Sequence, residues 1–263
     1  MSGAVSKKAM EFRIQMSPKA TFECGQCFRW NADADGVYHG VAFGETASAV
    51  TDGASAVLRC SAEAYERVWR DYFDVDTDYE AIGRHVAINA HMERAVQFGA
   101  GIRILRQEPW EALCSFIISQ CNNIPRIKKI VETLCAAFGE ELADGVFAFP
   151  SAERLALFDV ADLALLRAGY RAGYIIGAAR AVAFGDGMPT SMAELLRLNG
   201  VGLKVASCVA LFGLHDLDAF PVDTWMKKAL ANHFGAGFDP AVFSPWAGVA
   251  QQYMFYYERS GGE

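Results

Sequence analysis

The sequence has no uninterrupted apolar run long enough to cross a bilayer, which argues against an integral membrane protein. It shows no secretory leader, and its seven cysteines are an odd number, so we expect reduced thiols in a cytoplasm-like compartment. Positive charge is also in short supply. The formal net charge of −7 argues against a broadly basic surface, although one local basic face can bind phosphate on an acidic protein.

Motifs that bind metals are missing as well. The five histidines form no HxH or HExxH pattern, and we interpret them as surface or satisfied core residues. Cys24 and Cys27, in ECGQCF, form a lone CxxC without a second ligand pair at zinc-site spacing. We interpret these two cysteines as small residues in a strand-turn region. The sequence therefore predicts neither a metal site nor a cofactor.

Short aromatic or β-branched runs fill the first sixty residues. TFECGQCFRW, VYHGVAFG and SAVLRC are separated by turn clusters, a pattern that predicts a small antiparallel meander. From Ala62 the spacing becomes helical, with Ser61 as the expected N-cap of the first helix. The predicted class is α+β, with a small N-terminal sheet region followed by an all-helical body. We place an N-terminal sheet domain at residues 1–90 and a helical domain at residues 91–263.

A lysine stands inside an apolar run in LNGVGLKVASCVALF. Gly200 and Gly202 bracket a tight connection between two predicted helices, and the exposed amides of such a hairpin form a seat for an anion such as a phosphate diester. A GxG connection alone is equally typical of a plain packing corner. Lys204 favours the functional interpretation, because a helix N-terminus and apolar neighbours both favour the neutral amine that attacks as a nucleophile. Cys208 lies one turn further along the same helical face.

A carboxylate follows downstream in DAFPVDTW. Pro221 fixes the local backbone, and Asp223 directly precedes a predicted helix that it is expected to cap. A capping carboxylate can also stabilise developing positive charge and assist proton transfer. The roles of cap and catalyst are therefore compatible at Asp223.

The combination LNGVGLKVASCV…DAFPVDTW resembles the helix-hairpin-helix glycosylase signature. The resemblance continues through GQCFRW, GIRILRQEPWEALCSFIISQCNNIPRIKKIVETLCAAFG and AGYRAGYI. From about Phe22 to Phe255 the chain is similar to the 8-oxoguanine DNA glycosylase/AP lyase family. No four-cysteine iron–sulfur pattern follows the helical body, which separates it from the endonuclease III and adenine-glycosylase branches.

The resemblance implies a bifunctional enzyme of base excision repair. Such an enzyme extrudes the damaged nucleotide, excises 8-oxoguanine through a lysine Schiff base and cleaves the strand by β-elimination. It implies Lys204 as the nucleophile and Asp223 as the group that stabilises charge on the sugar. It also implies a base pocket built from five residues, which are Gly25, Cys208, Pro221, Gln251 and Phe255.

Within that implied pocket, the Gly25 carbonyl would accept the N7 proton that ordinary guanine lacks. Gln251 would read the Watson–Crick edge, while Phe255 and Cys208 would sandwich the ring. The resemblance also implies contacts to DNA from the hairpin, from the CNN segment and from residues near the starts of predicted helices. These residues are Cys121, Asn122, Arg126, Tyr170, Arg171, Gly200, Gly202, Val205 and Trp225.

Tyr170 would be the wedge in the duplex, and Arg126 and Arg171 would read the orphaned cytosine with their donor forks. The chain departs from the family pattern at Cys121, where the first of three asparagines often stands, and at Trp225, where some members carry histidine. Asn199 also replaces the usual hairpin proline.

The implied partner is double-stranded DNA with 8-oxoguanine, preferably opposite cytosine. We expect a monomer without membrane contact, located in the cytoplasm with the nucleoid, or in the nucleus if the source is eukaryotic. Two alternatives remain. One is a monofunctional alkylation-type glycosylase, which typically lacks the hairpin lysine. The other is a non-catalytic damage-recognition or architectural DNA-binding protein, and the pairing of Lys204 with Asp223 argues against it.

Overall fold

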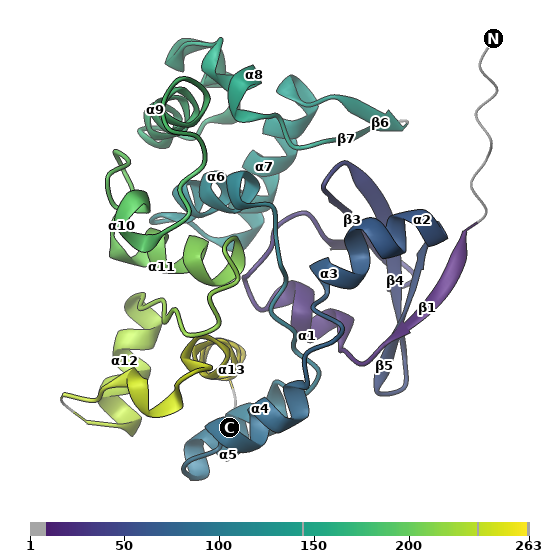
Figure 1. Cartoon of the computed structure of the whole chain (residues 1–263), viewed down its shortest axis with the longest axis vertical. Helices are drawn as coiled ribbons and strands as arrows, with labels where there is room; N and C mark the ends of the chain where they lie inside the picture. Colours follow the sequence, from purple (N-terminus) through teal and green to yellow (C-terminus); the bar gives the residue numbers. More distant parts are fainter. Residues whose placement is uncertain (1–8, 144, 236, 262–263) are drawn as a thin grey trace.

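A computed structural model describes residues 9–143, 145–235 and 237–261. It has two parts, a β-sheet with its helices on one side and a larger group of helices on the other (Figure 1). The strands of the sheet are β1 (Met10–Ile14), β2 (Asn31–Ala32), β3 (Tyr38–Ala42), β4 (Glu45–Asp52) and β5 (Ser55–Cys60).

The sheet is antiparallel, with strand order β1-β5-β4-β3-β2. Strands β2 to β5 form the predicted meander, and β1 pairs with the free side of β5. A continuous helical segment packs with the sheet around one hydrophobic core. The segment consists of α2 (Ala62–Ala64), the π-helical turn η1 (Tyr65–Trp69) and α3 (Arg70–Tyr72). The predicted N-cap at Ser61 is confirmed, since its side chain accepts a hydrogen bond from the Ala64 amide.

The remaining elements form the helical body. They are α4 (Tyr79–Val86), α5 (Ala90–Phe98), α6 (Pro109–Ser119), α7 (Ile124–Phe138), β6 (Glu141–Ala143), β7 (Val146–Phe147), α8 (Ala152–Ala156), η2 (Val160–Leu166), α9 (Arg171–Phe184), α10 (Met192–Leu195), α11 (Leu203–Phe212), α12 (Thr224–His233), η3 (Pro240–Phe243) and α13 (Ala247–Arg259). Among the described residues, no helix is both long and apolar enough to cross a membrane.

Helices α6 and α11 lie at the centre of this body because nearly every position of both is apolar and buried. They pack against each other, and the rings of Phe116 and Phe212 stack with centroids 5.4 Å apart. The backbone joins the pair further, since the Gln107 amide donates to the Phe212 carbonyl. This packing brings the C-terminal end of α6 close to the N-terminal end of α11, where the GxG connection lies.

The α+β prediction is confirmed, but three local predictions were wrong. TFECGQCFRW is not a strand, because Ser17 caps a short helix, α1 (Pro18–Glu23), in which Pro18 takes the favourable first position. The helical pattern of residues 77–99 divides into α4 and α5, because Asn89 caps a new helix. The helical body also contains the small β6–β7 hairpin. The domain boundary after residue 90 stays a prediction.

Candidate active site

Lys204 lies at the second position of α11, where its amine is half-buried. The Lys204 Nζ atom donates to Ser119 Oγ at 3.0 Å and lies 5.3 Å from the centre of the Phe116 ring. It also contacts the Cys208 thiol one turn further along. Burial raises the pKa of Cys208 to about 11, although the nearby ammonium of Lys204 lowers it. The Cys208 thiol is therefore neutral at pH 7.

Asp223 is the N-cap of α12, as predicted, and its carboxylate accepts a hydrogen bond from the Met226 amide at 2.8 Å. It lies near enough to Cys208 for its charge to raise the pKa of that thiol. Lys204 and Asp223 therefore both lie within electrostatic range of one buried thiol. Pro221, two residues before the cap, is also buried.

Gly25 lies in a loop that only a glycine fits comfortably. Its φ of +86° is in the left-handed region, and an added Cβ would lie 3.3 Å from both the Phe255 ring and the Arg259 guanidinium. The fully buried Gln26 fixes this loop, since its amide nitrogen donates to the Thr21 and Arg103 carbonyls. The Gly25 backbone is thus held rigidly against Phe255.

Gln251 and Phe255 lie one turn apart on α13, the last described helix. Gln251 is only 5% exposed, and its Oε1 atom has no hydrogen-bond partner among the described residues. A buried amide oxygen without a partner is costly unless a ligand supplies a donor. Its neighbour Gln252 donates to the Cys24 carbonyl at 2.8 Å, which ties α13 to the Gly25 loop. The predicted pocket residues from the two ends of the chain are therefore brought together.

The GxG connection forms a helix start without a side-chain cap. Gly202 is the N-cap of α11, so the amides of the first turn, including that of the buried Val205, point outward without a capping partner among the described side chains. Gly200 has a φ of +83°, and an added Cβ would lie 2.2 Å from the Tyr174 ring. The Gly200 carbonyl accepts from Gln120 Nε2 at 3.1 Å, which ties the hairpin to the end of α6. This geometry can seat a phosphate.

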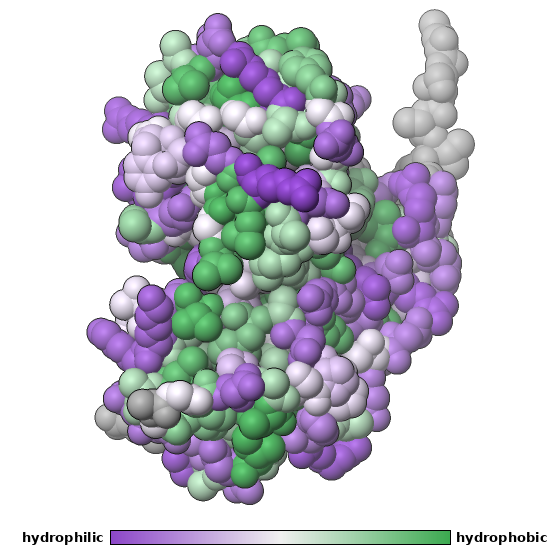
Figure 2. All heavy atoms as spheres, turned by 60° about the vertical axis from the view of Figure 1, so that its left-hand side comes forward, coloured by the Kyte–Doolittle hydropathy of each residue, from purple (hydrophilic) through white to green (hydrophobic). Residues whose placement is uncertain are grey.

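Two aromatic side chains at the starts of helices are exposed. Tyr170, at the N-cap of α9, is 53% exposed, and Trp225, in the first turn of α12, is 52% exposed. They lie on the side of the molecule that carries α9, α11 and α12 in Figure 1. Figure 2 turns this side forward and shows a surface of mixed polarity that is indented between the upper and lower helices.

The two arginines predicted to read the opposite base differ in their surroundings. Arg171 is only 5% exposed and donates to the carbonyls of Gln120, Ala168 and Cys121. These bonds use four of its five N–H groups, because both Nε and Nη2 donate to Gln120. Arg126 is exposed, and its guanidinium makes one hydrogen bond, from Nη2 to the Arg167 carbonyl. Among the described residues, Arg126 therefore leaves more of its guanidinium N–H groups available to bind a base than Arg171 does.

Between these arginines the CNN segment turns sharply. Cys121 is exposed and has a φ of +47°, in the left-handed region that ordinary side chains rarely adopt. Asn122 accepts from the Asn123 amide and donates to the Ile118 carbonyl, and Asn123 caps α7. The two asparagines are therefore used to shape the turn that carries Cys121.

We expect Cys121→Asn to stabilise the protein, because asparagine adopts the left-handed conformation more readily than cysteine. The gain should be roughly 0.5–1 kcal/mol, which raises the thermal midpoint by about 1–4 °C in a chain of this size. Thermal unfolding checks this, with Cys121→Ser as the control that changes polarity without improving the turn. An asparagine variant no more stable than the serine variant would contradict it.

Several residues of this site escaped the sequence analysis. Ser119 and Phe116 surround the lysine, Gln26 fixes the Gly25 loop, and Gln120 joins Arg171 to the hairpin. All of them lie within GQCFRW or the long central block, but their partners are distant in sequence. The packing of α6 on α11 brings Ser119 and Phe116 to the lysine, and the approach of α9 to the end of α6 brings Arg171 to Gln120.

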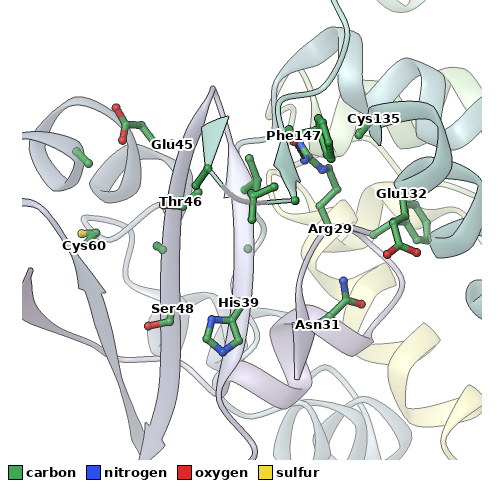
Figure 3. A pocket seen from close by; sticks show the side chains of 18 of the residues that line it. Arg29, Asn31, His39, Glu45, Thr46, Ser48, Cys60, Glu132, Cys135 and Phe147 are labelled. Atoms are coloured by element: carbon green, nitrogen blue, oxygen red, sulfur yellow. Dashed lines mark hydrogen bonds between the residues drawn. The ribbon is translucent and has the colours of Figure 1, made fainter. Parts of the chain in front are cut away.

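The predicted site residues do not line the cleft of about 1000 Å³ between the sheet and α7 (Figure 3). Its walls carry structural contacts instead, since Arg29 donates to the Phe147 carbonyl and pairs with the buried Glu111 at 3.5 Å. Burial raises the pKa of Glu111 to about 7, although Arg29 lowers it. This cleft is separate from the lysine site.

The site combines an uncapped hairpin, a half-buried lysine and a capping aspartate in a helical body. These features are those of the helix-hairpin-helix class of base excision repair proteins. Residues 114–241 match the model of that class, the HhH-GPD superfamily of base excision DNA repair proteins. Residues 9–113 match the N-terminal domain of 8-oxoguanine DNA glycosylase. The chain belongs to the 8-oxoguanine DNA glycosylase family.

Individual proteins agree with this assignment. The structure of MBOgg1 with a low-affinity DNA ligand is 37% identical, superimposes with a TM-score of 0.89, and aligns over 97% of this chain and 96% of its own. The Clostridium acetobutylicum 8-oxoguanine glycosylase/lyase, solved with DNA containing cytosine opposite 8-oxoG, is 34% identical with a TM-score of 0.86, covering 95% and 94%. A Saccharomyces cerevisiae N-glycosylase/DNA lyase is 38% identical over 60% of this chain, and the match spans 48% of that relative.

Proposed function

We propose that this protein is a bifunctional DNA glycosylase/AP lyase that removes 8-oxoguanine from duplex DNA. The observation that carries the proposal is that the Lys204 amine and the Asp223 carboxylate both lie within electrostatic range of the Cys208 thiol. The buried Gln251 oxygen, which has no hydrogen-bond partner among the described residues, supports it. Membership of the family and the activity named for its relatives support it. We expect it to act in base excision repair as a monomer. Its expected location is the cytoplasm with the nucleoid, or the nucleus if the source is eukaryotic.

The chemistry follows from these groups. The Lys204 amine attacks C1′ of the extruded nucleotide, the bond from C1′ to the base breaks, and the base leaves with the proton that the amine loses. Asp223 stabilises the positive charge that develops on the sugar. After the sugar ring opens, C1′ and the lysine nitrogen form an imine. Loss of a C2′ proton then expels the 3′ phosphate oxygen, which cuts the strand, and water releases the lysine.

The pocket selects the base before chemistry. The Gly25 carbonyl accepts the proton on N7, and Gln251 supplies an amide for the Watson–Crick edge. Phe255 and the neutral thiol of Cys208 offer apolar surfaces to the two faces of the ring. The exposed amides of the hairpin bind a phosphate of the damaged strand.

Borohydride trapping on a duplex with 8-oxoguanine opposite cytosine tests the proposal. Reduction of an imine fixes the protein covalently to DNA, so the proposal requires a protein–DNA adduct that depends on the lesion. Lesion binding without an adduct or base release would instead indicate the damage-recognition alternative. Base release without an adduct would indicate a monofunctional glycosylase.

Arg126→Ala is expected to weaken the preference for cytosine opposite the lesion by about tenfold, since one good bidentate base contact is worth roughly 1–3 kcal/mol. The measurement is single-turnover excision on four duplexes that differ only in the opposite base. Lys129→Ala removes an exposed charge from the same helix without a donor fork and is the matched control. Equal preference in Arg126→Ala and the parent protein would reject this role for Arg126.

Arg171→Ala is a poorer test of base reading. Its side chain holds three backbone carbonyls at the end of α6 and the start of α9, so removing it disturbs the turn itself.

A further inference from the structure

Two histidines and a glutamate meet away from the lysine site. His91 belongs to α5, His233 is the last residue of α12, and Glu258 lies near the end of α13. Glu258 Oε1 lies 3.4 Å from His91 Nε2 and 3.0 Å from His233 Nε2, and one potential ligand atom from each residue lies within 4.8 Å of the others. Zinc bonds of about 2.0–2.2 Å in a tetrahedron separate neighbouring ligand atoms by roughly 3.3 Å. The spacing therefore suits a small divalent ion.

The burial of His91 supports a ligand at this cluster. Its side chain is 6% exposed, and neither ring nitrogen has a hydrogen-bond partner among the described residues. Leaving both nitrogens of a buried imidazole without a partner is costly. A metal ion bound to the ring would supply one of the missing partners.

Access and charge also suit a metal ion. His233 and Glu258 are partly exposed, at 33% and 23%, so an ion can enter from solvent and keep a water molecule as its fourth ligand. The carboxylate supplies one negative charge to the ion. The rings of His91 and His233 stack with centroids 3.7 Å apart, so the more exposed His233 ring must rotate until both nitrogen lone pairs converge.

We propose that His91, His233 and Glu258 bind a zinc ion that joins α5, α12 and α13. Two imidazoles and one carboxylate with an open position are a donor set that zinc accepts. No sequence motif indicates this site, because each ligand comes from a different helix.

The site would act on stability and on the pocket, not on the chemistry at Lys204. Asp223 caps the start of α12 and His233 ends it, and on α13 Glu258 follows Phe255 by less than one turn. An ion at this end would fix the two helices that carry Asp223, Gln251 and Phe255. The proposal rests on the ligand cluster alone and does not depend on the proposed excision activity.

Zinc titration of the metal-free full-length protein tests the site. The background carries Cys121→Ser, because Cys121 is the exposed thiol among the described cysteines and could bind zinc itself. We expect one zinc per chain, and at a free concentration of 100 times the dissociation constant the thermal midpoint should rise by roughly 5–10 °C.

His233→Asn and Glu258→Gln should each weaken zinc binding at least about tenfold, since each removes one ligand. The matched control is His39→Asn, which alters an exposed histidine–carboxylate pair, His39 with Asp33 at 2.9 Å, that lacks a second imidazole. Its zinc affinity should equal that of the background. Failure to bind zinc at one per chain, or unchanged binding in both ligand variants, would overturn the proposal.

A second measurement needs no ligand substitution. X-ray absorption of the zinc-loaded background protein should show imidazole nitrogen and oxygen donors without sulfur. A sulfur donor would place the ion at a cysteine and refute the site.

Discussion

Lys204→Gln is expected to lower the single-turnover rate of 8-oxoguanine excision by at least about 10⁴-fold and to abolish borohydride trapping. Glutamine has no nucleophilic amine, so neither displacement of the base nor imine formation can occur. Glutamine is similar in bulk to lysine and stays polar beside the Ser119 hydroxyl and the Phe116 ring, so the fold and lesion binding should persist. Excision and trapping are measured on the same 8-oxoguanine:cytosine duplex, and binding is measured separately.

Lys129→Gln is the matched control for this experiment. It makes the same chemical change on the exposed surface of α7, where the lysine's ion-pair partner among the described residues is Glu132. We expect normal excision and trapping in this variant. Retention of trapping in Lys204→Gln would remove the lysine from the mechanism, whatever happened to the rate.

Asp223→Asn is expected to slow excision by about 10²–10⁴-fold while DNA affinity changes little. Asparagine caps a helix about as well as aspartate, so its side-chain oxygen can keep the bond from the Met226 amide. The free energy of unfolding should therefore fall by no more than about 1 kcal/mol, the contribution of the lost charge at a helix start. The loss should appear in the chemical step, measured under single turnover.

The control for Asp223 is Asp78→Asn, the same change at the N-cap of α4, where the carboxylate accepts from the Ala81 amide. If both variants retained the parent rate and lost similar stability, Asp223 would be a cap and nothing more. Slow excision by Asp223→Asn together with normal excision by Asp78→Asn would show that the charge of Asp223, and not its capping hydrogen bond, contributes to the chemical step.

How far the sequence predicted the site depended on how local each feature is. The Asp223 cap and the start of α11 follow from neighbouring residues, so the sequence predicted both. The same local reasoning failed at α1, where aromatic and small residues resembled a strand but Ser17 and Pro18 start a helix. The position of the β6–β7 hairpin was missed because its strands are too short to show alternation.

Features that depend on packing could not be predicted. The contact between Lys204 and Ser119 joins residues 85 positions apart, and it exists only because α6 packs on α11. The burial of Arg171 among backbone carbonyls depends on the approach of α9 to the end of α6. Neither arrangement leaves a periodic signal in the sequence, because each is set by how helices meet.

The hydrogen bond from Gln252 to the Cys24 carbonyl joins residues 228 positions apart. Closing a loop of this length costs conformational entropy, and the contact must offset that cost before it stabilises the chain. Contacts between residues so far apart in sequence therefore form late in folding. During synthesis the sheet around Trp30 can condense early, because its residues are close in sequence. The base pocket cannot, since α13 leaves the ribosome long after the Gly25 loop. A growing chain therefore carries its lysine hairpin before the proposed base pocket exists, and the proposed nucleophile would gain selectivity only when synthesis is nearly complete.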